Sequence, residues 1–224
     1  MINTYFIAFF IVFISFLLLT VFLLTINFNQ DHPLIILDNS AKAFFSEMSL
    51  NKFLHEFMVY VTIYGREYTW GPVLIALFLL GGEVGRKTAI LTGLAIIILV
   101  LVGGEIKNII DRERPDLADD IYLLEEESKK SYPSGHALIV SAGATGVICL
   151  YHGNLRRKII SLLLVIEAGL VIFSRIYLGL HYPLDMIAGI LLGMSVTFFF
   201  LGFQKQVFTL SERIFSFIKT RTIK

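Results

Sequence analysis

The chain has 224 residues, of which 56% are hydrophobic and only 17% are charged, and its mean hydropathy is +0.75. Soluble domains contain about 25% charged residues, so this composition excludes a water-soluble protein and predicts a membrane protein. The net charge of +1 excludes the basic surface that nucleic-acid binding requires, so no nucleic acid is expected as a partner. The single cysteine excludes a disulfide framework, and the length predicts one membrane-embedded domain over residues 1–224.

A membrane-crossing helix needs about 20 mostly apolar residues, and the chain offers several such stretches. The first has its apolar body at residues 5–28 and is expected to be retained, because it lacks the basic start and the cleavage site of a signal peptide. For the second, only fifteen uncharged residues separate Glu67 from Glu83. This helix must therefore use part of the stretch 57–64 or hold Arg66 near the interface. Four further crossings are expected at about 88–110, 134–151, 159–178 and 183–203.

The segment over residues 31–56 separates the first two crossings. Between Pro33 and about Lys52 it mixes pairs of apolar residues with charges such as Asp38 and Lys42. This pattern predicts an amphipathic helix that lies along the membrane surface. The expected fold class is therefore all-α, a polytopic bundle of six transmembrane helices with a short interfacial helix.

The last crossing contains a pair of glycines one helical turn apart, Gly189 and Gly193. Such a pair allows close helix packing, either inside the bundle or at the face of a dimer. Monomer and dimer therefore both remain open.

Lysines and arginines predict how the bundle is oriented. Six crossings put both termini on one side of the membrane, and the loops on that side carry ten Lys and Arg residues against eight on the other. The other side also holds the acidic run from Asp111 to Glu127. Because basic loops stay in the cytoplasm, the termini are expected to be cytoplasmic and the loop from Asp111 to Tyr132 to face outward.

Ionisable residues at the ends of membrane helices are candidates for function, because burying them is costly unless they are paired. The first group contains Lys107 and Arg114, which are seven residues apart. If the third crossing continues as a helix, they share a face and can bind one anion, and Pro115 then ends the helix. A basic helix end that merely reaches toward the membrane surface explains this pattern equally well.

The second group, Pro133-Ser134-Gly135-His136, directly precedes an apolar helix. Ser134 is a good N-cap, and Gly135 allows the backbone to approach a ligand closely. The free amides at such a helix start can bind an anion, with His136 beside it. A capped helix whose histidine only faces water is the alternative.

The third group contains Arg175, His181 and Asp185. Pro183 suits the first turn of the last helix, so His181 is expected just outside that helix and Asp185 one turn inside it. A carboxylate near an imidazole fixes its tautomer and stabilises its cation, although the pair could also simply hold a loop in place. In the six-helix arrangement all three groups lie at the outer face.

The three groups together resemble the signature of the type 2 phosphatidic acid phosphatase superfamily. This signature is Lys-x6-Arg-Pro, then Pro-Ser-Gly-His, then Ser-Arg-x5-His-x3-Asp, and the chain matches it at every position. The signature core covers about residues 85–205. The resemblance implies a membrane enzyme that hydrolyses a lipid phosphomonoester or diphosphate, such as phosphatidylglycerol phosphate, phosphatidic acid or undecaprenyl diphosphate.

The resemblance also implies a role for each signature residue. His181 would be the nucleophile that forms a phosphohistidine, Asp185 would orient it, and His136 would be the general acid and then the base. The phosphoryl oxygens would be held by Lys107, Arg114, Ser134, Gly135 and Arg175. No cofactor and no metal are implied, and the expected partners are the lipid substrate and the bilayer.

Three other functions remain as alternatives. A phosphotransferase of the same superfamily would pass the phosphoryl group to another lipid. A transporter or inactive scaffold would need the cations but not His136, His181 and Asp185. A haloperoxidase has the same anion site in soluble relatives, which six membrane helices disfavour.

Overall fold

The computed structural model describes residues 3–48, 50–115 and 129–210. These ranges are helical and contain no strand, apart from one isolated antiparallel bridge between Glu113 and Lys130. The helices are α1 (Thr4–Thr25), α2 (Pro33–Ser46), α3 (Lys52–Tyr64), α4 (Glu67–Leu80), α5 (Gly82–Ile110), α6 (Gly135–Leu150), α7 (Leu155–Tyr177) and α8 (Pro183–Gly202). The all-α prediction is confirmed for the described residues, whereas most of the acidic loop lies outside them.

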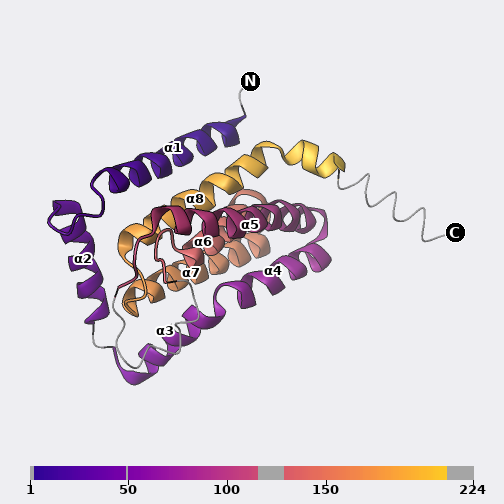
Figure 1. The fold of residues 1–224 in the computed structure, drawn as a ribbon. Helices are drawn as coiled ribbons and strands as arrows, with labels where there is room; N and C mark the ends of the chain where they lie inside the picture. The colour runs from indigo at the N-terminus through magenta and orange to yellow at the C-terminus, as the bar shows by residue number, and fades with distance from the viewer. Residues whose placement is uncertain (1–2, 49, 116–128, 211–224) are drawn as a thin grey trace.

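The long helices form a bundle in which α6 packs against α5, α7 and α8. Helix α1 lies along α8, and α4 lies along α5 on another side of the bundle (Figure 1). Helices α2 and α3 lie at the end of the bundle where α5 ends and α6 begins (Figure 1). The side chain of Asn3 donates a hydrogen bond to the carbonyl of Gly202 (3.0 Å), so the start of α1 and the end of α8 lie together at the opposite end.

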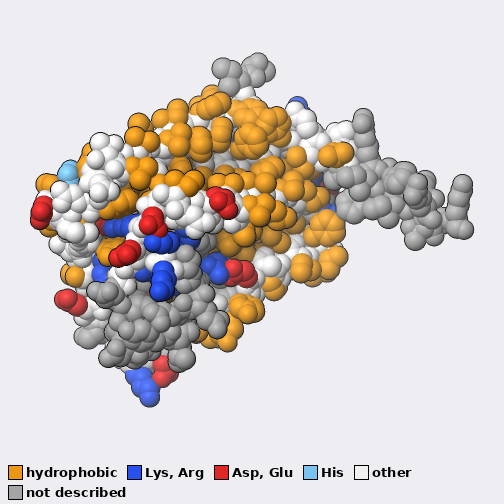
Figure 2. Space-filling view, in the orientation of Figure 1, with side chains coloured by type: hydrophobic (Ala, Val, Ile, Leu, Met, Phe, Trp, Pro, Cys, Tyr) orange, Lys and Arg blue, Asp and Glu red, His pale blue; other side chains and the backbone are white. Residues whose placement is uncertain are grey.

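Four of the described helices, α1, α5, α7 and α8, are long and apolar enough to cross a membrane. Helices α4 and α6 are apolar but shorter, with 14 and 16 residues. Hydrophobic side chains cover most of the visible side of the bundle, and charged side chains gather toward the end that carries α2 (Figure 2). The protein is therefore a multi-pass membrane protein.

The second predicted crossing is broken in the structure. Residues 57–64 belong to α3, which ends before Gly65, and α4 starts again at Glu67. A side chain at Gly65 would collide with Val171 of α7. The backbone between α3 and α4 therefore packs closely against α7 at Gly65, and this close approach is possible because glycine has no Cβ.

The segment between the first two crossings lies across the end of the bundle, as Figure 1 shows for α2. Helix α2 has one face against the bundle and one exposed: Ile35 is buried, while Ile36 and Leu37 are exposed. One charge departs from the pattern of a surface helix, because Asp38 lies on the buried face.

The glycine pair of α8 packs against α6. A Cβ at Gly189 would lie 2.7 Å from the Cβ of Ala137 and 2.8 Å from the carbonyl oxygen of Ser134, and one at Gly193 would collide with Ser141. The glycine pair therefore serves packing inside the bundle, which is one of the two possibilities that the sequence allows; the other is a dimer face. It holds the start of α8 against the start of α6.

Candidate active site

His181 of the α7–α8 turn and Asp185 of α8 form a buried pair at the end of the bundle where α2 lies. Pro183 is the first residue of α8, as the sequence predicts, and both side chains of the pair are 0% exposed. The Nδ1 atom of His181 lies 3.3 Å from Oδ2 of Asp185, which also accepts a hydrogen bond from the amide of Tyr182 (3.0 Å). The proton of the neutral imidazole therefore belongs on Nδ1, and Nε2 keeps its lone pair.

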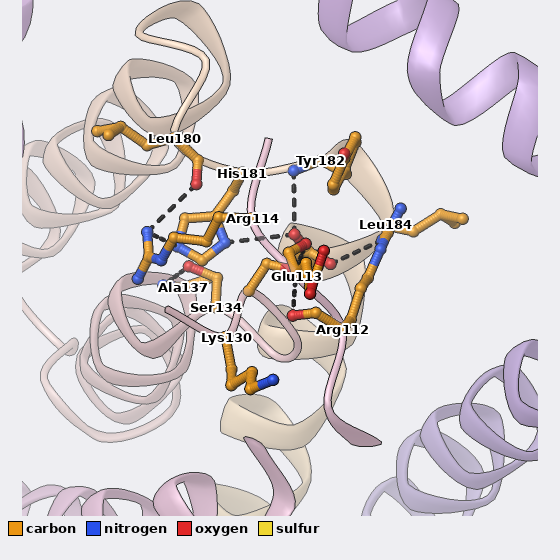
Figure 3. A network of polar contacts seen from close by, with 12 residues as sticks. Arg112, Glu113, Arg114, Lys130, Ser134, Ala137, Leu180, His181, Tyr182 and Leu184 are labelled. Carbon is orange, nitrogen blue, oxygen red and sulfur yellow. Dashed lines mark hydrogen bonds and ion pairs between the residues drawn. The ribbon is translucent and has the colours of Figure 1, made fainter. Parts of the chain in front are cut away.

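Arg114 lies on the other side of the imidazole. Its Nη1 atom is 3.3 Å from Nε2 of His181 and donates to the carbonyl oxygen of Leu180 (3.2 Å). Figure 3 shows the guanidinium beside the ring. A phosphoryl group that approached Nε2 would therefore meet a cation with several donors.

The condition under which Lys107 and Arg114 would share a helical face is not met, because α5 ends at Ile110, near the expected end of the third crossing, and does not continue to Pro115. Asp111 adopts the left-handed conformation (φ 57°), which aspartate tolerates better than most residues. The chain is then extended, and Glu113 forms its bridge with Lys130. Lys107 consequently does not share a helical face with Arg114, and its Nζ atom donates to the carbonyl oxygen of Lys130 (2.9 Å).

The extended path brings Arg112 into the site, a residue that the sequence patterns did not single out. Its Nη1 atom donates to Oδ1 of Asp185 (2.7 Å), and its Nη2 atom donates to Oδ2 of Asp38 (2.6 Å). Burial alone would lower the pKa of the Arg112 guanidinium, but the two carboxylates outweigh it and raise that pKa. The side chain therefore stays charged. Residues i and i+2 of an extended segment lie on the same face. An extended interpretation of this segment would therefore have indicated Arg112, together with Arg114, as a candidate site residue.

The Ser-Gly-His group begins α6 as predicted. Ser134 is the N-cap, and its hydroxyl oxygen accepts a hydrogen bond from the amide of Ala137 (3.4 Å). The amide of Ser134 donates to the backbone carbonyl of Asp185 (3.1 Å), which ties the start of α6 to the start of α8. Gly135 is the first residue of α6 and is only partly buried. The positive end of the α6 dipole thus lies beside the His181–Asp185 pair.

His136 and Arg175 meet at Thr62 of α3. The Nε2 atom of His136 lies 3.1 Å from the carbonyl oxygen of Thr62, and Arg175 Nη1 donates to the Thr62 hydroxyl (3.4 Å). The Nδ1 atom of His136 is 3.3 Å from Nη1 of Arg66, at the break between α3 and α4. Because arginine can only donate, Nδ1 is the acceptor and the Nε2 proton points at Thr62.

Arg66 is the second residue of this site that the sequence patterns did not assign. From the sequence, Arg66 is expected only to lie near the membrane interface. Its neighbours in the sequence do not indicate a contact with a histidine 70 positions later. A lone arginine beside an apolar helix is a weak signal. Only the packing of the α3–α4 break onto α6 brings the two together.

The two buried acidic groups of the site are bound to an arginine. No set of three His, Cys, Asp or Glu side chains arranged to hold a metal ion occurs within the described residues. Asp38 and Asp185 both bind Arg112, so their oxygens are directed at a guanidinium. The arrangement suits an anionic ligand better than a cation, because its other charged side chains are also cations: Arg66, Arg114, Arg175 and Lys107.

Comparisons with known proteins identify the same part of the chain. A sequence model of the PAP2 superfamily matches residues 88–208. An undecaprenyl-diphosphatase of Sulfolobus acidocaldarius is 40% identical over 147 residues, which are 65% of this chain and 68% of that protein. Phosphatidylglycerophosphatase B of Bacillus subtilis is 30% identical over 112 residues, which are 48% of this chain and 53% of that protein.

The fold also resembles a solved structure. The crystal structure of the PAP2 type phosphatidylglycerolphosphate phosphatase from Bacillus subtilis covers 87% of this chain and 94% of its own, with a TM-score of 0.66 and 24% sequence identity. The family match covers more than half of the chain and includes all three signature groups. The chain therefore belongs to the PAP2 superfamily and is a membrane hydrolase that acts on phosphate esters.

Proposed function

We propose that the protein removes the terminal phosphate of a long-chain prenyl diphosphate, such as undecaprenyl diphosphate, at the outer face of a cell membrane. The buried His181–Asp185 pair is the observation that supports the proposal most. Asp185 contacts Nδ1 of His181, and the Nε2 atom of His181 lies beside Arg114, which can bind a phosphate group. The choice of lipid is supported by the 40% identity to the undecaprenyl-diphosphatase.

His181 is the nucleophile of this mechanism. Its Nε2 lone pair attacks the terminal phosphorus in line with the bond to the bridging oxygen, which breaks as the nitrogen–phosphorus bond forms. The imidazole becomes cationic, and Asp185 stabilises this charge through the Nδ1 proton. The products of the first step are a phosphohistidine and the lipid monophosphate.

His136 moves the protons. As the imidazolium, it gives its Nδ1 proton to the oxygen that leaves with the lipid monophosphate, and the neutral ring later takes a proton from the water that attacks the phosphohistidine. Its position is supported by the contacts of both ring nitrogens, with Arg66 and with the Thr62 carbonyl, which hold the imidazole at the start of α6. The second step releases inorganic phosphate and restores both histidines.

The cations and the helix start stabilise the transferring phosphoryl group. Arg114 and Arg175 suit two phosphate oxygens each, and Lys107 adds a single positive charge. The Ser134 hydroxyl and the Gly135 amide lie at the positive end of α6, where anions bind. Charge that builds up in the transition state is neutralised by these groups, so no step requires a metal ion.

Six crossings fit this mechanism, with α3 and α4 together making the second crossing and α6 the fourth. At a rise of about 1.5 Å per residue, α4 and α6 alone would span only part of the roughly 30 Å core. The site then lies at the outer end, because the opposite end carries a basic set that favours the cytoplasm: Arg86, Lys87, Arg156, Arg157 and Lys158. Phosphate binds at headgroup depth, and the lipid tail lies between helices.

Phosphate release from defined lipids tests the proposal. The purified protein in detergent is expected to release phosphate from undecaprenyl diphosphate, both in buffer and in excess EDTA. His181→Ala should reduce this rate to the background, because it removes the attacking nitrogen. His152→Ala is the matched control, since His152 is exposed in the turn between α6 and α7 at the other end of the bundle. Substantial turnover by His181→Ala would refute the nucleophile, and a metal requirement would refute the metal-free mechanism.

Phosphatidylglycerol phosphate is the second candidate substrate, favoured by the 30% identity to phosphatidylglycerophosphatase B. A panel of undecaprenyl diphosphate, phosphatidylglycerol phosphate and phosphatidic acid ranks the three lipids by kcat/KM. Free phosphate is measured together with labelled lipid products. Label that appears in a second lipid rather than in phosphate would identify a lipid-to-lipid phosphotransferase.

A further inference from the structure

Asp38 is a buried acid in a helix that lies outside the matched PAP2 region. It belongs to α2, and the family match starts 50 residues later, at residue 88. The side chain is fully enclosed, and both of its oxygens are used. Oδ2 accepts from Nη2 of Arg112 (2.6 Å), and Oδ1 accepts from the backbone amide of Leu184 (2.9 Å).

Arg112 connects Asp38 to the catalytic pair. One end of its guanidinium binds Asp38 and the other binds Asp185, at 2.6 Å and 2.7 Å. The aromatic rings of Phe28 and Tyr182 lie near the guanidinium, with ring centroids 5.0 Å and 4.0 Å from its central carbon. The two ion pairs fix the guanidinium within its own plane, and the contacts with the two rings restrain it perpendicular to that plane.

The two carboxylates compete for this one guanidinium. As long as Asp38 holds Nη2, Arg112 bonds only Oδ1 of Asp185, and Oδ2 stays directed at His181 and at the Tyr182 amide. Arginine prefers to bind a carboxylate through both nitrogens. Without Asp38, the guanidinium is free to turn onto both oxygens of Asp185 and draw Oδ2 away from the imidazole.

We propose that Asp38 is a positioning residue, which acts through Arg112 to keep Asp185 aligned with His181. The inference rests on the proposed function, because it assigns the pair to catalysis. It makes α2 a part of the active site, although this helix has the composition of a surface segment. Asp38 itself does not touch the substrate in this arrangement, so its effect is confined to the chemical step.

Asp38→Asn tests the proposal, because asparagine keeps the oxygen that accepts from Leu184 but loses the charge that holds Arg112. We expect kcat for undecaprenyl diphosphate to fall by about 10- to 100-fold, which is typical of a small misalignment, with KM unchanged. Asp38→Glu, which restores the charge, should recover most of kcat. The matched control is Asp31→Asn, since Asp31 is an exposed acid just before the same helix.

A double-mutant cycle separates positioning from a purely structural role. If Asp38 acts through Arg112, Asp38→Asn should lower kcat in the wild-type chain but have no further effect in Arg112→Gln. An equal loss in both backgrounds would overturn the proposal, because it would mean that Asp38 acts only through the α8 backbone. Unchanged kcat in Asp38→Asn, or an Asp38→Glu variant no better than Asp38→Asn, would overturn it as well.

Folding and the proposed function are controlled separately. Thermal unfolding in detergent identifies any variant that does not fold. If Asp38→Asn is such a variant, Arg112→Gln tests the same link from the other side, and wild-type kcat there would overturn the proposal. A wild-type protein that releases no phosphate from any lipid of the panel would instead contradict the proposed function.

Discussion

At the scale of single residues, the site depends on arginines that differ in what they bind. Arg112 holds two carboxylates, whereas Arg114 contacts Nε2 of the His181 ring and the Leu180 carbonyl. The first holds the acids of the site in place, and the second lies beside the nitrogen that we propose attacks phosphorus. Both come from a stretch of three residues, Arg112 to Arg114, so the direction of each side chain decides its role.

Arg114→Lys is expected to lower kcat/KM by at least about tenfold, although it keeps the charge. A lysine has one nitrogen and cannot contact two phosphate oxygens in a fixed plane, so stabilisation of the transition state is lost. Phosphate release at several lipid concentrations measures the effect. Arg86→Lys, an exposed arginine at the start of α5, is the control and should have wild-type kinetics. Equal kinetics of the two variants would show that Arg114 contributes only charge.

At the scale of elements, three helix boundaries make the site. The end of α5, the start of α6 and the start of α8 meet because α6 and α8 pack closely through Gly189 and Gly193. The sequence predicts the α6 and α8 boundaries well, since Ser134 and Pro183 are strong local start signals. It also places the end of the third crossing at about 110, where α5 ends, but it has no signal for the left-handed turn at Asp111 that redirects the chain.

Gly189→Ala should destabilise the protein and lower its activity. The added methyl group would lie 2.8 Å from a backbone oxygen of α6, so α8 must move, and Asp185 lies one turn away on the same helix. Overpacking of this kind costs about 1–3 kcal/mol. Thermal unfolding in detergent and phosphate release measure the two effects.

Gly104→Ala is the matched control for this prediction. Gly104 also lies in a helix, but a Cβ there has no neighbour within 4 Å. This variant should be as stable as the wild type or slightly more so, because alanine favours helix over glycine. A Gly189→Ala variant that matched it in both measurements would contradict the close packing of α8 on α6.

At the scale of the whole molecule, the bundle separates two charged ends. The proposed catalytic groups lie at the end that carries α2, and the turn between α6 and α7 lies at the other end with Arg156 and Arg157. The ends of the described chain agree with this arrangement, since Asn3 contacts Gly202. The start of α1 and the end of α8 thus lie at one end of the bundle, as the six crossings that we propose require.

Cysteine labelling tests the proposed orientation. Cys149→Ser removes the single native cysteine, and a new cysteine is placed either at Asp31, near the site, or at His152, at the other end. In intact cells, a maleimide that cannot cross membranes should label Asp31→Cys and should label His152→Cys only after permeabilisation. The reverse pattern would place the active site in the cytoplasm.

The sequence by itself determined the membrane class, the helical fold and the three signature groups, because each depends on local patterns. Apolar length, N-cap residues and the spacing within each group are read over a few residues of chain. The proposed catalytic pair is of this kind, since His181 and Asp185 are only four residues apart. These features do not need knowledge of how distant helices pack.

Only the tertiary structure decided which other charges join the site. Asp38 and Arg112 are separated by 74 residues, and Arg66 and His136 by 70. Each of these residues alone has the pattern of an ordinary charge near a membrane surface. They come together because α5 ends at Ile110 and because α2 and the α3–α4 break pack over the end of the bundle. A buried charge destabilises the fold unless an opposite charge or a hydrogen-bonding group lies beside it. Which groups lie beside each other depends on how the helices pack.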